Sequence, residues 1–169
     1  MSKPSKKKAA DFSDIRLLGF DIDGVFTDGR FYLSDDGVES KAFNTQDGFG
    51  IRRLLSAGIH VAVISGRRSA AVEKRMQELD IAHVILGCPD KVAAFDALRQ
   101  SLQLSWSQCG YVGDDVPDLP LLRQVGFAGA VANAVEEVRR KCDYVTAAHG
   151  GHGAVREVCD LVFGASNRR

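Results

Sequence analysis

Four short polar segments of this 169-residue chain carry side chains that suit chemistry on a phosphate group. The first holds two aspartates, the second a serine, the third a lysine and the fourth three aspartates, which are Asp21, Asp23, Ser65, Lys91, Asp114, Asp115 and Asp118. Carboxylates that are held close together repel one another, and a divalent cation relieves that repulsion. Because the segments offer oxygen ligands without histidine or cysteine, they favour Mg²⁺.

Such a set of side chains would support phosphoryl transfer. An aspartate can attack phosphorus and form an aspartyl phosphate. A magnesium ion and a lysine would neutralise the non-bridging oxygens, and a serine hydroxyl would donate a hydrogen bond to one of them. The sequence therefore predicts a phosphoryl site if the four segments meet in space.

Each segment has a simpler interpretation when it is taken alone. Asp-x-Asp-Gly and Ser65-Gly66 are both typical of turns, and Lys91 is typical of a solvated helix position. The acidic residues at 114–118 also suit the N-terminus of a helix. All four segments follow short apolar runs, however, and this shared position favours one common site.

The apolar runs are expected to be buried strands, because they are short and end at polar or glycine-containing segments. They cover residues 15–20, 60–64, 83–86, 109–112, 127–130 and 144–146. Amphipathic helices are expected at residues 51–55, 72–79, 90–98, 118–122, 135–140 and 154–163. This alternation predicts an α/β fold, a doubly wound parallel sheet of the Rossmann-like type. Such sheets bind ligands beyond the carboxyl ends of their strands, where the four polar segments stand.

Residues 30–43 interrupt the alternation with a predicted β-hairpin. Two short stretches, 31–33 and 38–43, flank the polar turn at residues 34–37, which ends in a glycine. The insertion is too short for a separate cap domain, so we expect a hairpin flap and no cap. A lone two-stranded hairpin is marginal in water, which predicts that the hairpins of several copies pack together.

The rest of the chain excludes several classes of protein. With 22 basic and 22 acidic residues, it lacks the net positive charge that nucleic-acid binders use. No apolar run approaches the roughly 18 residues needed to cross a bilayer. The four cysteines form no CxxC pair and no apolar segment follows the basic N-terminus, so we expect free thiols and a cytoplasmic protein. We predict one domain at residues 13–163, between a disordered basic tail at 1–12 and a C-terminal tail at 164–169.

Taken together, the four segments resemble the motifs of the haloacid dehalogenase superfamily of phosphohydrolases. Residues 41–52, 111–116 and 150–158 are more specifically similar to 3-deoxy-D-manno-octulosonate 8-phosphate phosphatases, a capless and tetrameric branch. The resemblance covers nearly all of residues 15–163. It implies a haloacid dehalogenase type of sheet, a homotetramer, and a neighbour's C-terminal tail that helps to close each site.

The resemblance also implies a role for each motif residue. Asp21 would be the nucleophile, and Asp23 the general acid for the leaving alkoxide and then the base for water. Ser65 and Lys91 would bind the phosphoryl oxygens. Mg²⁺ would be held by Asp21, the backbone carbonyl of Asp23 and Asp114, with Asp115 or Asp118 nearby. The chemistry agrees, since Asp23 needs a raised pKa to carry a proton while contact with Mg²⁺ keeps Asp21 ionised.

The implied substrate is a phosphorylated sugar acid, 3-deoxy-D-manno-octulosonate 8-phosphate, a precursor in lipopolysaccharide synthesis. Arginines suit its carboxylate because a guanidinium donates two parallel hydrogen bonds. The candidate substrate-binding residues are Asp23, Asn44, Gln46, Asp47, Gly48, Arg52, Gly66, Arg67, Arg75 and Lys91. The family commonly has arginine where this chain has Gln46, and this departure leaves the exact sugar open.

Other interpretations remain at this point. A neuraminate or nonulosonate 9-phosphate phosphatase would use the same chemistry. A receiver-like phospho-switch domain also combines acids, a hydroxyl, a lysine and Mg²⁺, but its lysine comes last, whereas Lys91 precedes the last acidic segment. A catalytically idle subunit is disfavoured because every motif residue is present. His149 and His152 have no pattern of acids or cysteines around them, so loop or substrate contact is favoured over a metal site, and the glycines at 150, 151 and 153 predict flexibility there.

Overall fold

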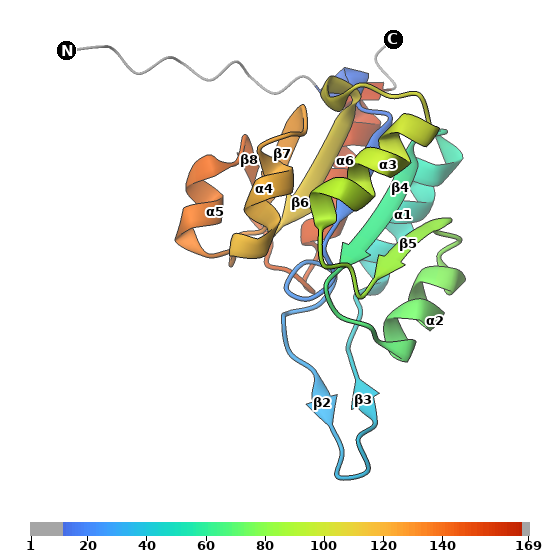
Figure 1. The fold of residues 1–169 in the computed structure, drawn as a ribbon, viewed down its shortest axis with the longest axis vertical. Helices are drawn as coiled ribbons and strands as arrows, with labels where there is room; N and C mark the ends of the chain where they lie inside the picture. Colours follow the sequence, from blue (N-terminus) through green and yellow to red (C-terminus); the bar gives the residue numbers. More distant parts are fainter. Residues whose placement is uncertain (1–11, 167–169) are drawn as a thin grey trace, which may run out of the picture.

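The centre of the protein is a parallel sheet of six strands, seen in a computed structural model that describes residues 12–166 (Figure 1). The strand order is β5-β4-β1-β6-β7-β8. The strands are β1 (Leu17–Phe20), β4 (His60–Ser65), β5 (His83–Leu86), β6 (Cys109–Gly113), β7 (Phe127–Ala130) and β8 (Tyr144–Val145). Every neighbouring pair is parallel, which confirms the predicted doubly wound α/β fold.

Helices cover both faces of this sheet. The helix α1 (Thr45–Ser56) packs against α6 (Ala154–Ser166) on one face, and α3 (Lys91–Ser101) and α4 (Leu119–Leu122) lie on the other (Figure 1). The helix α2 (Ala70–Glu78) lies beside β5, and α5 (Glu136–Lys141) lies near the β8 edge. Short 3-10 helices occupy Phe12–Asp14, Trp106–Gln108 and Val116–Asp118. In the part of the chain that the structure describes, no helix is both long and apolar enough to cross a membrane.

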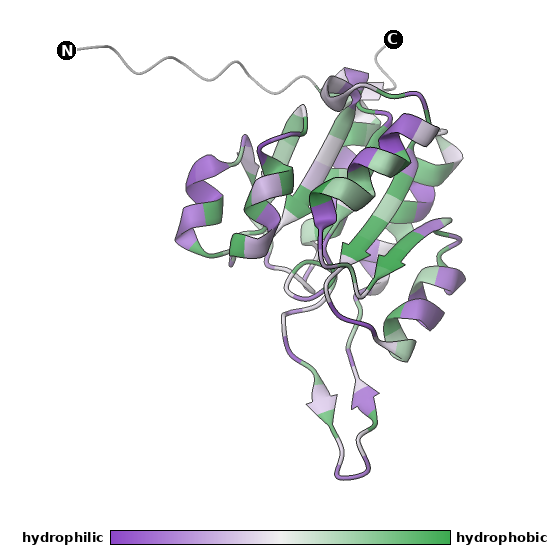
Figure 2. Cartoon of the chain, in the orientation of Figure 1, coloured by the Kyte–Doolittle hydropathy of each residue, from purple (hydrophilic) through white to green (hydrophobic). Residues whose placement is uncertain are grey.

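The inner strands are apolar throughout because helices cover the sheet on both sides. All residues of β1 and β6 are buried, and Figure 2 shows the hydrophobic colour concentrated in the sheet. The strands β1, β4 and β6 change from apolar to polar residues at their carboxyl ends. The sequence therefore places the polar segments together at one edge, below the strand arrowheads in Figure 1.

Both predicted tails differ from the structure by a few residues. Phe12 belongs to the first 3-10 helix and its ring packs edge-on against Phe127, with centroids 4.7 Å apart. The rest of the predicted N-terminal tail lies outside the described residues. At the other end α6 continues to Ser166, three residues beyond the predicted boundary, and Ser166 Oγ donates to the carbonyl of Phe163. Gly164 to Ser166 carry no charge and no proline that would end the helix earlier.

The predicted hairpin is present but its paired strands are shorter than expected. The antiparallel strands β2 (Tyr32–Leu33) and β3 (Glu39–Ser40) are joined by a turn in which Gly37 has a φ of +82°. The hairpin projects away from the carboxyl ends of the sheet strands (Figure 1). The exposed fractions of Tyr32 and Leu33 are 74% and 65%, so within a single chain these apolar side chains stand in water.

Candidate active site

A cavity of about 490 Å³ opens at the carboxyl edge of the sheet. All four polar segments of the sequence contribute to its lining, which includes Asp21, Asp23, Ser65, Gly66, Arg67, Lys91, Asp114, Asp115 and Asp118. They come from the loops that follow β1, β4, β5 and β6, strands that lie side by side in the sheet. The structure therefore brings together residues that are almost 100 positions apart in the chain.

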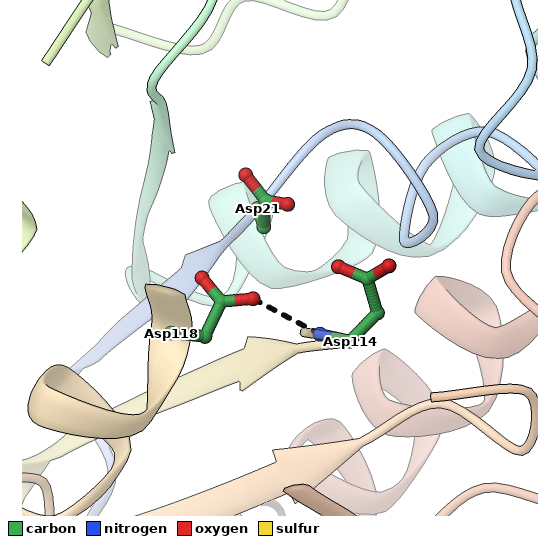
Figure 3. Close-up of side chains that lie close together, drawn as sticks. All are labelled: Asp21, Asp114 and Asp118. Carbon is green, nitrogen blue, oxygen red and sulfur yellow. Dashed lines mark hydrogen bonds between the residues drawn. The ribbon is translucent and has the colours of Figure 1, made fainter. Parts of the chain in front are cut away.

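Three carboxylates form a cluster in this cavity. Asp21, Asp114 and Asp118 each offer an oxygen, and these oxygens lie within 4.8 Å of one another. Figure 3 shows the three carboxylates on the same side of the strand ends. An all-oxygen set of this size fits a small hard cation such as Mg²⁺. The side chain of Asp23 is not part of the cluster.

Lys91 is the cation that faces the cluster. Its Nζ donates to Asp21 Oδ1 at 2.8 Å and to Asp118 Oδ1 at 2.7 Å. Lys91 is the first residue of α3, and Asp90 caps that helix by accepting from the backbone N–H of Ala93 at 3.0 Å. Burial alone would lower the pKa of Lys91, but the two carboxylates outweigh it and raise the pKa. Lys91 therefore remains an ammonium.

Asp118 holds the other groups of the site in place. Its Oδ1 also accepts from the Tyr111 hydroxyl at 2.9 Å, and its Oδ2 accepts from the backbone N–H groups of Asp114 at 3.0 Å and Asp115 at 3.4 Å. Because both oxygens are already engaged, Asp21 and Asp114 are better placed than Asp118 to bind a cation. The prediction missed Tyr111, since a tyrosine inside an apolar strand is typical of core packing.

A close backbone approach explains the glycine that follows Asp23. Gly24 has a φ of +91°, and a Cβ atom there would lie 2.0 Å from Asp114 Oδ2. Any other residue would clash with the Asp114 carboxylate at this position. Gly150 packs against the same loop, because its Cβ would lie 1.7 Å from the carbonyl oxygen of Gly24. We predicted flexibility at Gly150. In the structure, its lack of a side chain instead allows the backbone to pack tightly against the Gly24 loop.

Two carboxylates of the cluster, those of Asp21 and Asp114, hold protons more tightly than ordinary aspartates. Burial and the negative charge of Asp118 raise the pKa of Asp21 to about 6, although Lys91 opposes the shift. Burial, followed by the charges of Asp21, Asp118 and Asp115, raises the pKa of Asp114 to about 8. Both shifts express the cost of placing negative charges together in a poorly hydrated site. A bound divalent cation would relieve that cost.

Asp23 lies in the cavity lining beside two cations. Its Oδ1 accepts from Lys41 Nζ at 2.5 Å, and its Oδ2 lies 3.9 Å from Arg67 Nε. Arg67 also donates to Glu39 Oε2 at 2.7 Å, and its guanidinium lies 4.5 Å from the ring centroid of Phe31. The prediction placed Arg67 in the site but gave no role to Lys41, which the sequence shows only as an ordinary charge after a short strand.

Ser65 is the buried last residue of β4. Its Oγ accepts from the backbone N–H of Arg67 at 3.2 Å, and its carbonyl accepts from the backbone N–H of Cys88 at 3.0 Å. These contacts join the loops that follow β4 and β5. Ser65 and Gly66 line the same cavity as the carboxylate cluster.

Several predicted substrate residues lie elsewhere in the single chain. Gly48, Arg52 and Arg75 line a separate cavity of about 520 Å³ between α1 and α2. Arg52 donates to the carbonyl of Glu78 at 2.6 Å, which directs its guanidinium along this face. Gly48 and Arg52 belong to α1, which follows the hairpin insertion and packs on α6, so they do not face the catalytic cavity. Arg75 belongs to α2, on the other side of this separate cavity.

In the structure, residues of the predicted sugar-binding loop accept hydrogen bonds from the first turns of α1 and α6. Asn44 caps α1 by accepting from the backbone N–H of Gln46 at 2.8 Å, and Gln46 is exposed. Asp47 is buried, and its Oδ1 accepts from the backbone N–H of Arg156 at 2.8 Å. The structure therefore does not place Asp47 in the substrate cavity. Asp47 lies in the first turn of α1 and contacts the first turn of α6, and a carboxylate is stabilised near helix N-termini.

His149 and His152 line a third cavity, of about 210 Å³, together with Asp28, Arg30 and Asn133. Among residues 12–166, the group of acids, histidines and cysteines that is close enough to hold a metal ion is the cluster of Asp21, Asp114 and Asp118. The two histidines are therefore not part of a metal-binding group in the described chain.

Comparisons with known proteins show which family the chain resembles. Residues 89–158 match the haloacid dehalogenase-like hydrolase family. The chain is 46% identical to the 3-deoxy-D-manno-octulosonate 8-phosphate phosphatase KdsC of Yersinia pestis over 92% of this chain and 83% of that one. The crystal structure of the Yersinia pestis phosphatase superposes with a TM-score of 0.92, at 46% identity, and covers 94% of this chain and 85% of that one. A Moraxella catarrhalis phosphatase in complex with magnesium, phosphate and KDO superposes with a TM-score of 0.91, at 44% identity over 94% of this chain and 91% of that one.

Proposed function

The chain belongs to the 3-deoxy-D-manno-octulosonate 8-phosphate phosphatases of the haloacid dehalogenase-like hydrolases, and we propose that it hydrolyses that sugar phosphate to 3-deoxy-D-manno-octulosonate and phosphate. The observation that carries this proposal is the meeting of Asp21, Lys91 and Asp114 in one cavity. A carboxylate nucleophile, an ammonium and a cation site are what attack on a phosphate ester requires.

The donor set fits Mg²⁺, the ion named in the Moraxella catarrhalis complex. The carboxylates of Asp21 and Asp114, with the backbone carbonyl of Asp23, would hold the ion, and Asp115 and Asp118 would support it. When bound, the ion neutralises charge on the phosphoryl oxygens and keeps Asp21 ionised. The raised pKa of Asp21 and of Asp114 supports this assignment, because Lys91 does not fully offset burial and the negative charges of the neighbouring carboxylates.

In the first half of the reaction, Asp21 attacks phosphorus. A bond forms between an Asp21 carboxylate oxygen and phosphorus, and the bond between phosphorus and the sugar oxygen breaks. Asp23 gives its proton to the departing sugar oxygen, so the sugar leaves as an alcohol. Lys91 and Ser65 bind the phosphoryl oxygens and stabilise the charge on them. The products of this half are the free sugar acid and an aspartyl phosphate on Asp21.

In the second half, water releases the phosphate. The Asp23 carboxylate, which has lost its proton, takes one from a water molecule as the water oxygen attacks phosphorus. The bond between phosphorus and Asp21 breaks, inorganic phosphate leaves, and both aspartates return to their starting states. Arg67 lies at the rim with a half-exposed side chain, a position suited to the substrate carboxylate.

We further propose that the active protein is a homotetramer in the cytoplasm. The hairpin exposes Tyr32, Leu33 and Val38, and a second copy would cover these side chains. In such an assembly, Arg52, Arg75 and Gln46, which lie outside the cavity of their own chain, would be available to a neighbouring site. Three of the cysteines, Cys88, Cys109 and Cys159, are thiols outside any disulfide, which fits a reducing compartment. A monomeric mass in light scattering would contradict the assembly.

Phosphate release tests the proposed function. We expect kcat/KM for 3-deoxy-D-manno-octulosonate 8-phosphate to exceed that for 4-nitrophenyl phosphate, and EDTA to abolish both activities. A nine-carbon neuraminate 9-phosphate serves as the comparison substrate, because Gln46 departs from the family pattern. Faster hydrolysis of the nine-carbon substrate would reassign the sugar. A single turnover without further phosphate release would indicate a receiver-like switch.

A further inference from the structure

Lys41 is a buried lysine that contacts Asp23, a residue of the catalytic cavity, from the hairpin side. It follows β3 directly, and the exposed fraction of its side chain is 0%. Its Nζ lies 2.5 Å from Asp23 Oδ1 and 3.3 Å from Glu39 Oε1. A buried ammonium is strongly disfavoured unless carboxylates pair with it. Here one of the two pairing carboxylates is that of the residue proposed to move the proton.

The two oxygens of Asp23 have different surroundings. Oδ1 is held by Lys41, whereas Oδ2 lies 3.9 Å from Arg67 Nε, too far for a hydrogen bond. Asp23 therefore has one oxygen fixed by the hairpin and a second oxygen available on the cavity side. The contact with Lys41 restricts the rotation of the Asp23 carboxylate. Oδ2 is then the oxygen that can contact the sugar oxygen of the substrate.

We propose that Lys41 is a positioning residue for Asp23 in the phosphatase reaction. The proposal rests on the acid–base role of Asp23 given above. Lys41 holds Oδ1 so that Oδ2 delivers its proton to the sugar oxygen as the bond between that oxygen and phosphorus breaks. Lys41 itself neither touches the substrate nor exchanges a proton with it.

The base of the hairpin is tied to the site by further contacts. Glu39, which pairs with Lys41, also accepts from Arg67 at 2.7 Å. The guanidinium of Arg67 lies 4.5 Å from the ring centroid of Phe31, at the start of the hairpin. Both sides of the hairpin base therefore contact the loop after β4. The hairpin supplies the ion pair that orients Asp23 in addition to its exposed apolar surface.

This role predicts an effect that depends on the leaving group. A sugar alkoxide leaves poorly without a proton, whereas nitrophenolate leaves without one. The value of kcat/KM reports only the steps up to the first irreversible one, which is departure of the leaving group. The test quantity is the selectivity ratio, defined as kcat/KM for the octulosonate 8-phosphate divided by kcat/KM for 4-nitrophenyl phosphate.

The decisive variant is Lys41→Met, which removes the charge but keeps the length of the side chain. General acid catalysis contributes about 10²–10⁴-fold, so we expect kcat/KM for the sugar phosphate to fall about 10–100-fold. We expect kcat/KM for 4-nitrophenyl phosphate to change less than about threefold, because binding of the phosphoryl group is intact. A merely structural role would lower both values together and leave the selectivity ratio unchanged, which would overturn the proposal.

Three further variants separate this proposal from the proposed function. Asp23→Asn removes the proton itself, and an unchanged selectivity ratio in that variant would refute the acid role of Asp23. A low ratio in Asp23→Asn together with a wild-type ratio in Lys41→Met would refute only the role of Lys41. In the double variant the lysine change should add nothing to the effect of Asp23→Asn, because Lys41 acts through Asp23. The exposed Lys74→Met is the matched control and should keep the wild-type ratio.

A second substitution guards against loss of folded protein. Lys41→Gln keeps a hydrogen-bond donor for Asp23 Oδ1 without the charge. We expect its selectivity ratio to fall in the same direction as that of Lys41→Met, but by less. A wild-type ratio in Lys41→Gln, with kcat/KM lowered equally for both substrates, would contradict positioning by Lys41.

Discussion

Asp21 differs from an ordinary aspartate because its carboxylate is buried beside other carboxylates and still accepts from an ammonium. Burial and Asp118 raise its pKa, while the contact with Lys91 at 2.8 Å works in the opposite direction. The same lysine also pairs with Asp118, so one cation serves two acids. This arrangement keeps the proposed nucleophile close to its ionised form and fixes its direction. A bound divalent ion would complete the balance of charge.

Replacement of the nucleophile should remove turnover and leave the fold. Asp21→Asn keeps the shape of the side chain and an acceptor for Lys91, but an amide does not attack phosphorus. We expect phosphate release to fall by about 10³-fold or more, since loss of a nucleophile removes the covalent route. Far-UV circular dichroism should be unchanged. Mass spectrometry of acid-quenched enzyme should find phosphate on residue 21 of the wild type and none there in the variant.

The matched control is Asp80→Asn, at an exposed aspartate whose φ of 60° asparagine tolerates well. Its activity should equal that of the wild type. Appreciable turnover in Asp21→Asn would contradict covalent catalysis at this position.

The residues of the site were predictable to different degrees. Asp21, Ser65, Lys91 and Asp114 stand at strand ends, and the topology of a parallel sheet then forces them to one edge. Lys41 was not predictable, because its partner Asp23 is 18 positions away and the hairpin path decides whether the two meet. The role of Tyr111 was not predictable for the same reason, because only tertiary packing brings its hydroxyl to Asp118.

The start of α6 depends on another helix. Gly153 precedes α6 and has a φ of +102°, and a glycine has no side chain with which to cap a helix. Asp47 of α1 supplies the missing acceptor, because its Oδ1 accepts a hydrogen bond from the backbone N–H of Arg156. The two helices pack against each other, and this contact ties the first turn of α6 to the first turn of α1.

Removal of this acceptor should lower stability without changing the chemistry. Loss of an N-terminal cap costs about 1 kcal/mol, within a range of about 0.5–2 kcal/mol. For a chain of this size, 1 kcal/mol corresponds to about 2–4 °C in the melting temperature. We therefore expect Asp47→Ala to melt a few degrees lower by calorimetry. Its kcat/KM at 25 °C should stay within about threefold of the wild-type value.

Asp47→Asn is the matched control, since its amide oxygen still accepts from Arg156 and should restore most of the lost melting temperature. A large loss of kcat/KM in Asp47→Ala, with an unchanged melting temperature, would instead support the substrate contact expected from the sequence.

Strands and helices were easier to predict than their roles. The runs at 83–86 and 127–130 became β5 and β7 with identical bounds, because short apolar runs between polar segments have few other solutions. The hairpin strands were predicted too long, since Phe43 and its neighbours turn toward α1 after only two paired residues in each strand. Asn44 to Gly48 resemble a binding loop in sequence, but the insertion carries them to the face covered by α6.

On the scale of the whole molecule, the net charge of zero conceals an uneven distribution. Three aspartates gather at one edge of the sheet, and two of them have a raised pKa. The metal-free protein should therefore be less stable at a pH where these groups are ionised, and a bound cation should return that stability.

The sign of this pH dependence follows from the direction of the shifts. An aspartate with a pKa of about 4 in the unfolded chain and about 6 or 8 in the folded one binds its proton more tightly when folded. The contribution of Asp21 and Asp114 to stability is thus greatest below pH 4 and decreases as the pH rises toward 8. A cation that prefers the ionised carboxylates binds better over the same range.

We therefore expect the melting temperature difference between samples in saturating Mg²⁺ and in EDTA to increase from pH 5.5 to pH 8. At a concentration of 100 times Kd, a ligand stabilises by about 2.7 kcal/mol, or roughly 5–10 °C here. Taking the difference at each pH cancels groups that titrate in both samples. Asp114→Asn removes one ligand and the group with the larger shift, so it should raise the melting temperature in EDTA at pH 8 and reduce the gain from Mg²⁺. A gain that is equal at both pH values, or larger at pH 5.5, would mean that the ion does not bind these carboxylates.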